Sequence, residues 1–111
     1  MEIVPRDGVY DYAARYTAGL TTWHAPGRLS EGVADAVAAA ALAAHGALGL
    51  RDLSRVDLIV DSDGRPHVLG VNVSPGMTET SLLPLAVQAE GLDFGKMMAT
   101  LVGRAGARGV G

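Results

Sequence analysis

The chain has 111 residues, of which 49% are hydrophobic and 19% are charged, and its formal net charge at pH 7 is -3. This length suits one domain or part of one, and the apolar fraction excludes a disordered chain. The acidic excess argues against a nucleic-acid-binding protein, and the absence of cysteine excludes disulfides and thiolate metal sites.

The N-terminal part predicts two short strands joined by a long loop. Residues Glu2–Pro5 form an apolar run that a proline ends, and Leu20–His24 is rich in β-forming residues. Between them, Arg6–Gly19 is polar, lacks clear periodicity and carries all three tyrosines of the chain. Because long loops in small domains often serve function, we expect functional residues in this segment.

A helix is predicted over Ser30–Leu48. Ser30 is a suitable N-cap, Glu31 suits the positive end of the helix dipole, and Gly49 ends the pattern. Apolar residues recur at spacings of three and four on one helical face, namely Val33, Val37, Ala41, Ala44 and Leu48. The small side chains among them predict close packing on a sheet.

The next segment alternates in polarity, which predicts a β-hairpin. Its strands are Ser54–Asp61 and Pro66–Val73, and Asp61-Ser62-Asp63-Gly64 is the turn. We expect Asp61 to pair with Pro66 across the turn.

This pairing gives the hairpin one unusually polar face. It places Asp57 opposite Gly70, and it places Arg55 opposite Asn72. Such a face suits a divalent cation and an anionic ligand, because Mg²⁺ prefers carboxylate and phosphate oxygens. The alternative is a solvent-exposed sheet face that carries a cross-strand salt bridge.

A loop around Pro75-Gly76 leads to two predicted helices, Leu82–Glu90 and Asp93–Arg104, the second with Asp93 as its N-cap. The Gly/Ala/Arg-rich segment Ala105–Gly111 is predicted to be a flexible tail. Together the elements predict an α+β fold with a mostly antiparallel sheet flanked by helices.

Other chemistry finds little support in the sequence. The turn Asp61–Gly64 lacks the later ligands of a calcium loop, and the histidines lack zinc-ligand spacing. No P-loop, dinucleotide-binding or Gly-x-Ser-x-Gly motif is present. No leader or long apolar run stands out, so we expect a cytoplasmic protein without membrane contact.

Two motifs resemble a known enzyme family. Residues Arg55–Pro84 read RVDLIVDSDGRPHVLGVNVSPGMTETSLLP, and Tyr10–Tyr16 read YDYAARY. Both resemble the C-terminal part of the D-alanine–D-alanine ligases, which are ATP-grasp enzymes of peptidoglycan synthesis. The resemblance implies a C-terminal ATP-grasp subdomain over residues 1–104, followed by the tail over 105–111. It also favours ligand binding at the polar hairpin face.

The resemblance implies a two-step reaction. ATP phosphorylates the carboxylate of one D-alanine, and the amine of a second D-alanine attacks the acyl phosphate. Arg55 and the backbone N–H of Gly76 match the donors that stabilise the oxyanion. Asp57 and Asn72 match ligands of the Mg²⁺ or Mn²⁺ ions on the ATP phosphates, which makes Asn72 part of the nucleotide site as well.

Four further positions follow from the resemblance. Ser81 and the backbone N–H of Leu82 match the cradle of the second D-alanine's carboxylate, at a helix N-terminus. Tyr16 matches a loop tyrosine that accompanies dipeptide rather than depsipeptide formation, in a loop that would close as a lid. Arg15 stands where the family pattern has a lysine, and it keeps the positive charge near phosphate.

The chain departs from the family pattern at Gly70, where the family has a glutamate that bridges two metal ions. Glycine offers no ligand. Because losing even an outer partner of a metal site costs about 10–100-fold in affinity, we expect a larger loss here.

The chain also departs in length. The domain that holds the first D-alanine and the subdomain that covers adenine are both missing, so we expect a ligase fragment that is inactive alone. Two alternatives stay open. One is a non-catalytic module that self-associates as a homodimer, and the other is a different ATP-grasp carboxylate–amine ligase.

Overall fold

The computed structural model describes residues 1–6, 21–78 and 81–109. It divides into two units, Met1–Ser30 and Glu31–Gly111, each of which has its own internal contacts. The first unit contains two antiparallel strands, and the second contains two antiparallel strands and three helices. This agrees with the α+β fold that the sequence predicts.

The first unit contains a two-stranded antiparallel sheet. Strands β1 (Glu2–Pro5) and β2 (Thr21–His24) pair with Glu2 opposite His24, and both predicted strands are confirmed. Glu2 accepts hydrogen bonds from the backbone N–H and the guanidinium of Arg28 at 3.0–3.1 Å. These bonds lower the pKa of Glu2 from 4.5 to about 2. Since the pKa falls on folding, the contact stabilises this unit above pH 4.5 and is lost as the pH falls towards 2.

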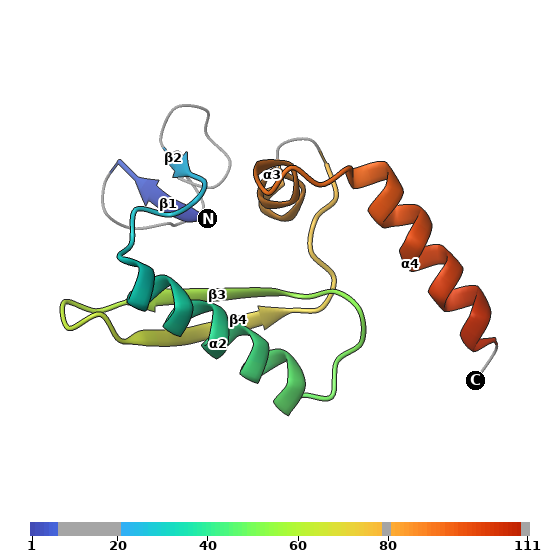
Figure 1. Ribbon diagram of the computed structural model, residues 1–111, viewed down its shortest axis with the longest axis horizontal. Helices are drawn as coiled ribbons and strands as arrows, with labels where there is room; N and C mark the ends of the chain where they lie inside the picture. Colours follow the sequence, from blue (N-terminus) through green and yellow to red (C-terminus); the bar gives the residue numbers. More distant parts are fainter. Residues whose placement is uncertain (7–20, 79–80, 110–111) are drawn as a thin grey trace. The chain divides into compact units, whose positions relative to one another are not determined.

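The second unit begins with a helix on a β-hairpin. Helix α2 (Glu31–Ala47) lies across the two strands β3 (Arg55–Val60) and β4 (Pro66–Asn72), as Figure 1 shows, and it contacts both. The predicted helix and hairpin are therefore confirmed. At the turn, Gly64 has a φ of 79°, and a Cβ there would come within 3.0 Å of Val33 Cγ2 on α2. The turn therefore requires glycine both for its backbone conformation and for the approach of the helix.

The face of the hairpin that α2 covers can be assigned from two contacts. His45 Nδ1 lies 2.7 Å from Ser54 Oγ, just before β3. Ala41, His45, Ser54 and Val56 line one hollow between α2 and the start of β3. Because side chains alternate along a strand, the side chains of Arg55 and Asp57 point to the opposite face. The polar face is thus the one that α2 leaves uncovered.

The register of the hairpin agrees with the predicted pairs at its open end. Arg55 pairs with Asn72, and Asp57 pairs with Gly70. Nearer the turn the predicted register is wrong, because Val60 and not Asp61 pairs with Pro66. An irregularity after Asp57 absorbs the one-residue difference.

Asp61 lies just past β3, where its backbone N–H donates to the Arg65 carbonyl at 3.0 Å and its carboxylate organises the turn. Its Oδ1 accepts hydrogen bonds from the backbone N–H groups of Asp63 and Arg65, both at 2.9 Å. Its Oδ2 lies 2.8 Å from His67 Nε2. The bonds with His67 and with the two N–H groups lower the pKa of Asp61. Such an aspartate turn is a local preference that strand alternation does not reveal.

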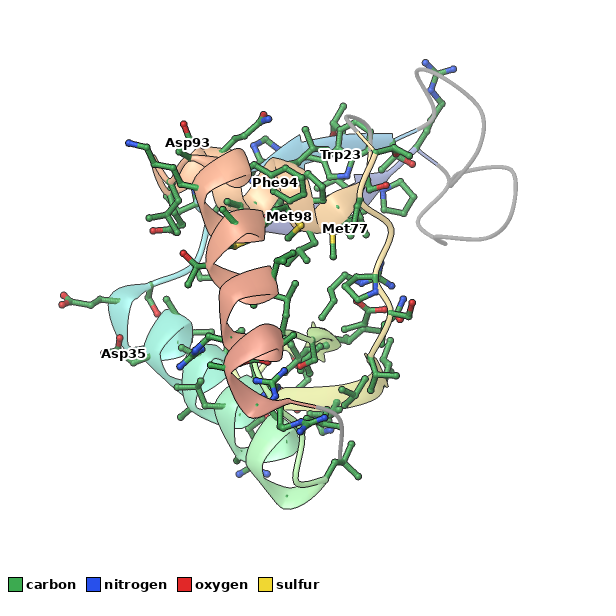
Figure 2. All side chains as sticks on the ribbon, turned by 90° about the vertical axis from the view of Figure 1, so that its right-hand side faces the viewer. Trp23, Asp35, Met77, Asp93, Phe94 and Met98 are labelled. Carbon is green, nitrogen blue, oxygen red and sulfur yellow. The ribbon has the colours of Figure 1, made fainter. Side chains whose placement is uncertain are left out.

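Two helices complete the second unit. They are α3 (Leu82–Ala89) and α4 (Phe94–Arg108), and Asp93 caps α4 by accepting a hydrogen bond from the Lys96 N–H at 2.8 Å. Figure 2 shows Phe94 and Met98 on one side of α4. The cap is as predicted, but α4 continues to Arg108 instead of ending at Arg104.

Asp52 explains why the last turn of α4 is helical. The carboxylate of Asp52 is 3.1 Å from Arg104 Nη1 and 2.9 Å from Arg108 Nη1, and its side chain is only 17% exposed. Asp52 also has a positive φ of 60°, which is uncommon for a residue other than glycine. Two ion pairs therefore fix the end of α4 to the connection between α2 and β3.

We expect Asp52→Asn to free the last turn of α4. Asparagine tolerates the same backbone conformation but carries no charge, so only the ion pairs are lost. Exposed pairs of this kind contribute about 1 kcal/mol or less. Amide hydrogen exchange of residues 104–108 should become faster. Asp35→Asn, which removes the same charge from α2 (Figure 2), is the control and should leave this exchange unchanged. Equal exchange in the two variants would contradict the assignment.

The described residues bury little apolar surface. The buried apolar residues among them are Pro75, Pro84 and Val87, the last of which is 8% exposed, and none of their side chains is fully buried. Leu42 on α2 and Val102 on α4 are each 73% exposed. In the described part of the chain, no helix has the length and apolar character needed to cross a membrane.

Candidate functional site

Arg55 and Asp57 form the centre of the polar face. They stand two residues apart on β3, so both side chains point to the same side of the hairpin. Arg55 Nε donates to Asp57 Oδ1 at 2.9 Å, and Arg55 Nη2 donates to Asp57 Oδ2 at 3.0 Å. The side chain of Arg55 is 20% exposed and that of Asp57 is 41% exposed. The two groups thus form a two-pronged ion pair that stays open to solvent on the carboxylate side.

Strand β4 supplies the other half of the face. Asn72, opposite Arg55, accepts a hydrogen bond at Oδ1 from the Ser74 N–H at 2.9 Å. This bond turns the chain out of the strand at its last residue. Gly70, opposite Asp57, is exposed, and a Cβ placed on it would meet no atom within 4 Å. The space in front of Asp57 is therefore open.

A second polar cluster follows the strand. A Cβ at Gly76 would lie 2.7 Å from Ser81 Oγ and 3.3 Å from Ser81 Cβ, so a side chain at this position would displace the Ser81 hydroxyl. Ser81 Oγ accepts a hydrogen bond from the Thr78 N–H at 3.1 Å and lies 2.6 Å from Thr78 Oγ1. The loop and the start of α3 are thus held together through one hydroxyl group.

Ser81 precedes α3 without capping it through its side chain. Its backbone is extended, with φ of -75° and ψ of 150°, and its side chain makes no hydrogen bond to the helix. The hydroxyl group is turned to Thr78 instead. Since the first N–H groups of a helix have no partner within the helix, Leu82 begins a helix end suited to an anionic group.

The structure brings the candidate residues together in two groups. Arg55, Asp57 and Asn72 share the polar hairpin face, and Gly76 lies against Ser81 at the start of α3. Arg15 and Tyr16 lie outside the described residues.

Sequence reasoning gave no role to two residues that the structure places at these groups. Thr78 bonds Ser81, and its position between the Pro-Gly pair and the helix N-cap was a signal that could have indicated it. Ile59 follows Asp57 on the same strand face and is 57% exposed. For Ile59, the signal in the sequence was an isoleucine that follows a charged pair on the polar side of the predicted strand.

The donors on the polar face fit one Mg²⁺ ion. Asp57 offers a carboxylate and Asn72 an amide oxygen, and both are oxygen ligands of the kind that Mg²⁺ prefers. No group of three or more histidine, cysteine or acidic residues able to hold a metal occurs within residues 1–6, 21–78 and 81–109. Phosphate oxygens and water would therefore have to complete the coordination.

Comparison with models of known protein families identifies the family of this chain. The family model described as D-ala D-ala ligase C-terminus matches residues 1–103. The chain belongs to this family. The match includes the hairpin and the whole segment from Gly76 to Ser81.

Several curated relatives are named D-alanine–D-alanine ligase. A D-alanine–D-alanine ligase of Anaeromyxobacter sp. (strain K) is 51% identical over 94 residues, which is 85% of this chain and 30% of the relative. A ligase of Pelotomaculum thermopropionicum is 46% identical over 102 residues, covering 92% of this chain and 32% of the relative. A ligase of Halalkalibacterium halodurans is 45% identical over 103 residues, covering 92% of this chain and 34% of the relative. The chain thus spans about a third of the length of these relatives.

Proposed function

We propose that the chain is the C-terminal ATP-grasp part, over residues 1–104, of a cytoplasmic ATP-dependent D-alanine–D-alanine ligase. Its reaction supplies the D-Ala-D-Ala dipeptide of peptidoglycan. The observation that carries the proposal is the grouping of Arg55, Asp57 and Asn72 on the hairpin face that α2 leaves free. A guanidinium, a carboxylate and a carboxamide together suit a nucleotide's phosphates and their counter-ion.

Arg55 and Gly76 are proposed to stabilise the negative charge that develops when an amine attacks the activated carboxyl group. Arg55 uses two of its five N–H donors on Asp57, so three remain for a ligand. Asp57 also fixes the plane of the guanidinium, which limits the entropy lost when a ligand binds. The backbone N–H of Gly76 would be the second donor.

Asp57 and Asn72 are proposed to hold Mg²⁺ or Mn²⁺ with the phosphates of ATP. A bound ion would offset the charge of the transferring phosphoryl group. Ile59 is proposed to contribute apolar surface for the nucleotide, since it is 57% exposed on the same face. Exposed apolar area next to charged ligands suits a molecule that carries both a base and phosphates.

Ser81 and the N–H of Leu82 are proposed to bind the carboxylate of the second D-alanine. The N-terminal end of α3 favours an anion, and the Ser81 hydroxyl is already oriented by Thr78. Tyr16 and Arg15 are proposed to act on the substrates in the roles that the family resemblance implies.

The test is a chimeric enzyme. This chain would replace the matching segment of the Anaeromyxobacter ligase, to which it is 51% identical. We expect D-alanine-dependent release of ADP from MgATP by the chimera, and none by the isolated chain. Acceptors other than D-alanine test the alternative of another carboxylate–amine ligase. A folded chimera that releases no ADP with D-alanine, even when it carries Gly70→Glu, would refute the proposal.

Self-association as a homodimer is a second candidate. It is favoured by the lack of any fully buried side chain among the described residues and by exposed Leu42 and Val102. Light scattering of the chain should then give twice the monomer mass, and a monomer at high concentration would exclude it.

A further inference from the structure

The polar face contains a carboxylate that is already neutralised. Asp57 is the single acidic residue of β3 and β4. Both of its oxygens receive hydrogen bonds from Arg55, at 2.9 and 3.0 Å. A cation that approached Asp57 would therefore lie beside a fixed positive charge, and the repulsion would cancel much of the attraction.

The neighbouring donors do not offset this repulsion. Asn72 carries no charge, and one lone pair of its Oδ1 is used by the Ser74 N–H. Gly70 faces Asp57 but has no side chain, and the space where one would stand is empty of protein atoms within 4 Å. The net charge of the four-residue face is therefore zero, which is unfavourable for holding a free divalent cation.

We propose that Arg55 is the resting counter-ion of Asp57, so that this face excludes free divalent cations and admits one only together with an anionic ligand that engages the guanidinium. The proposal deepens the proposed function and depends on it for the nature of that ligand, a phosphate. It makes Arg55 a residue that controls the order in which the site fills. Gly70 maintains this control, because no second carboxylate stands ready to bind the ion.

Binding of free Mn²⁺ to the full chain, followed by electron paramagnetic resonance without nucleotide, tests the proposal. Wild type and Asp57→Asn should bind Mn²⁺ equally, since the Arg55 guanidinium offsets the charge of the Asp57 carboxylate. Arg55→Gln should bind about tenfold more tightly, because it removes the competing charge. The double variant Arg55→Gln/Asp57→Asn should lose this gain. Arg65→Gln removes the same charge from the turn and is the matched control, expected to equal wild type.

A second variant approaches the site from the other strand. Gly70→Glu adds one negative charge where the structure has room, and it should also raise Mn²⁺ affinity about tenfold or more. The uncharged Gly70→Gln should not. Tighter binding by wild type than by Asp57→Asn, or no gain from Arg55→Gln and Gly70→Glu, would overturn the proposal. An inactive chimera with these Mn²⁺ gains would refute only the ligase function, whereas an active chimera without them would refute only this inference.

Discussion

Replacing Arg55 by alanine in the chimeric ligase is expected to lower kcat about 100- to 1000-fold. This is the loss seen when one donor to a developing oxyanion is removed from an enzyme site. Arg55 is held by both oxygens of Asp57, so its donors are oriented before substrate binds. Steady-state kinetics of ADP release would measure the effect. The KM for D-alanine should change much less, because the donor acts on charge that is present only in the transition state.

Two further variants sharpen this experiment. Arg55→Lys keeps the charge but not the two-pronged geometry, so it should recover only part of the lost rate. Arg65→Ala removes a guanidinium from the exposed turn and should leave kcat unchanged. A rate for Arg55→Ala within about threefold of the parent chimera would show that another group stabilises the oxyanion.

The local structure was predictable where short-range rules act. Alternation predicted the hairpin, and the pairing of Arg55 with Asn72 followed from it. The N-cap role of Asp93 followed from side-chain chemistry alone. The register at the turn did not follow, because the carboxylate of Asp61 competes with strand pairing. Strand alternation and the turn preference of aspartate both act on Asp61, and the sequence alone does not show which of them sets the register.

The end of α4 could not be predicted, since it depends on a contact between distant segments. Arg104 and Asp52 are 52 residues apart, and nothing in the sequence around either one indicates the other. The candidate site is an intermediate case. Strand geometry places Arg55 with Asp57 on one face, whereas the ion pair that closes Asp57 to cations requires the observed side-chain conformations.

Replacing Gly76 by alanine is expected to destabilise the second unit by about 1–3 kcal/mol, the usual cost of forcing a methyl group into occupied space. The new Cβ would lie 2.7 Å from Ser81 Oγ, so the hydroxyl must rotate away. That rotation breaks its bonds with Thr78, at 3.1 and 2.6 Å. Urea unfolding would measure the free energy, and faster exchange of the Thr78 amide would locate the change.

A double-mutant cycle shows whether the Ser81 hydroxyl is the cause. In a Ser81→Ala background the hydroxyl is gone, and the remaining 3.3 Å contact with Cβ is one that a small shift relieves. Gly76→Ala should therefore cost less in that background than in wild type. Gly103→Ala, in α4 where no atom stands within 4 Å of the new Cβ, is the matched control and should be neutral or stabilising. Equal costs in both backgrounds would mean that glycine is needed at position 76 for a reason other than the approach of Ser81.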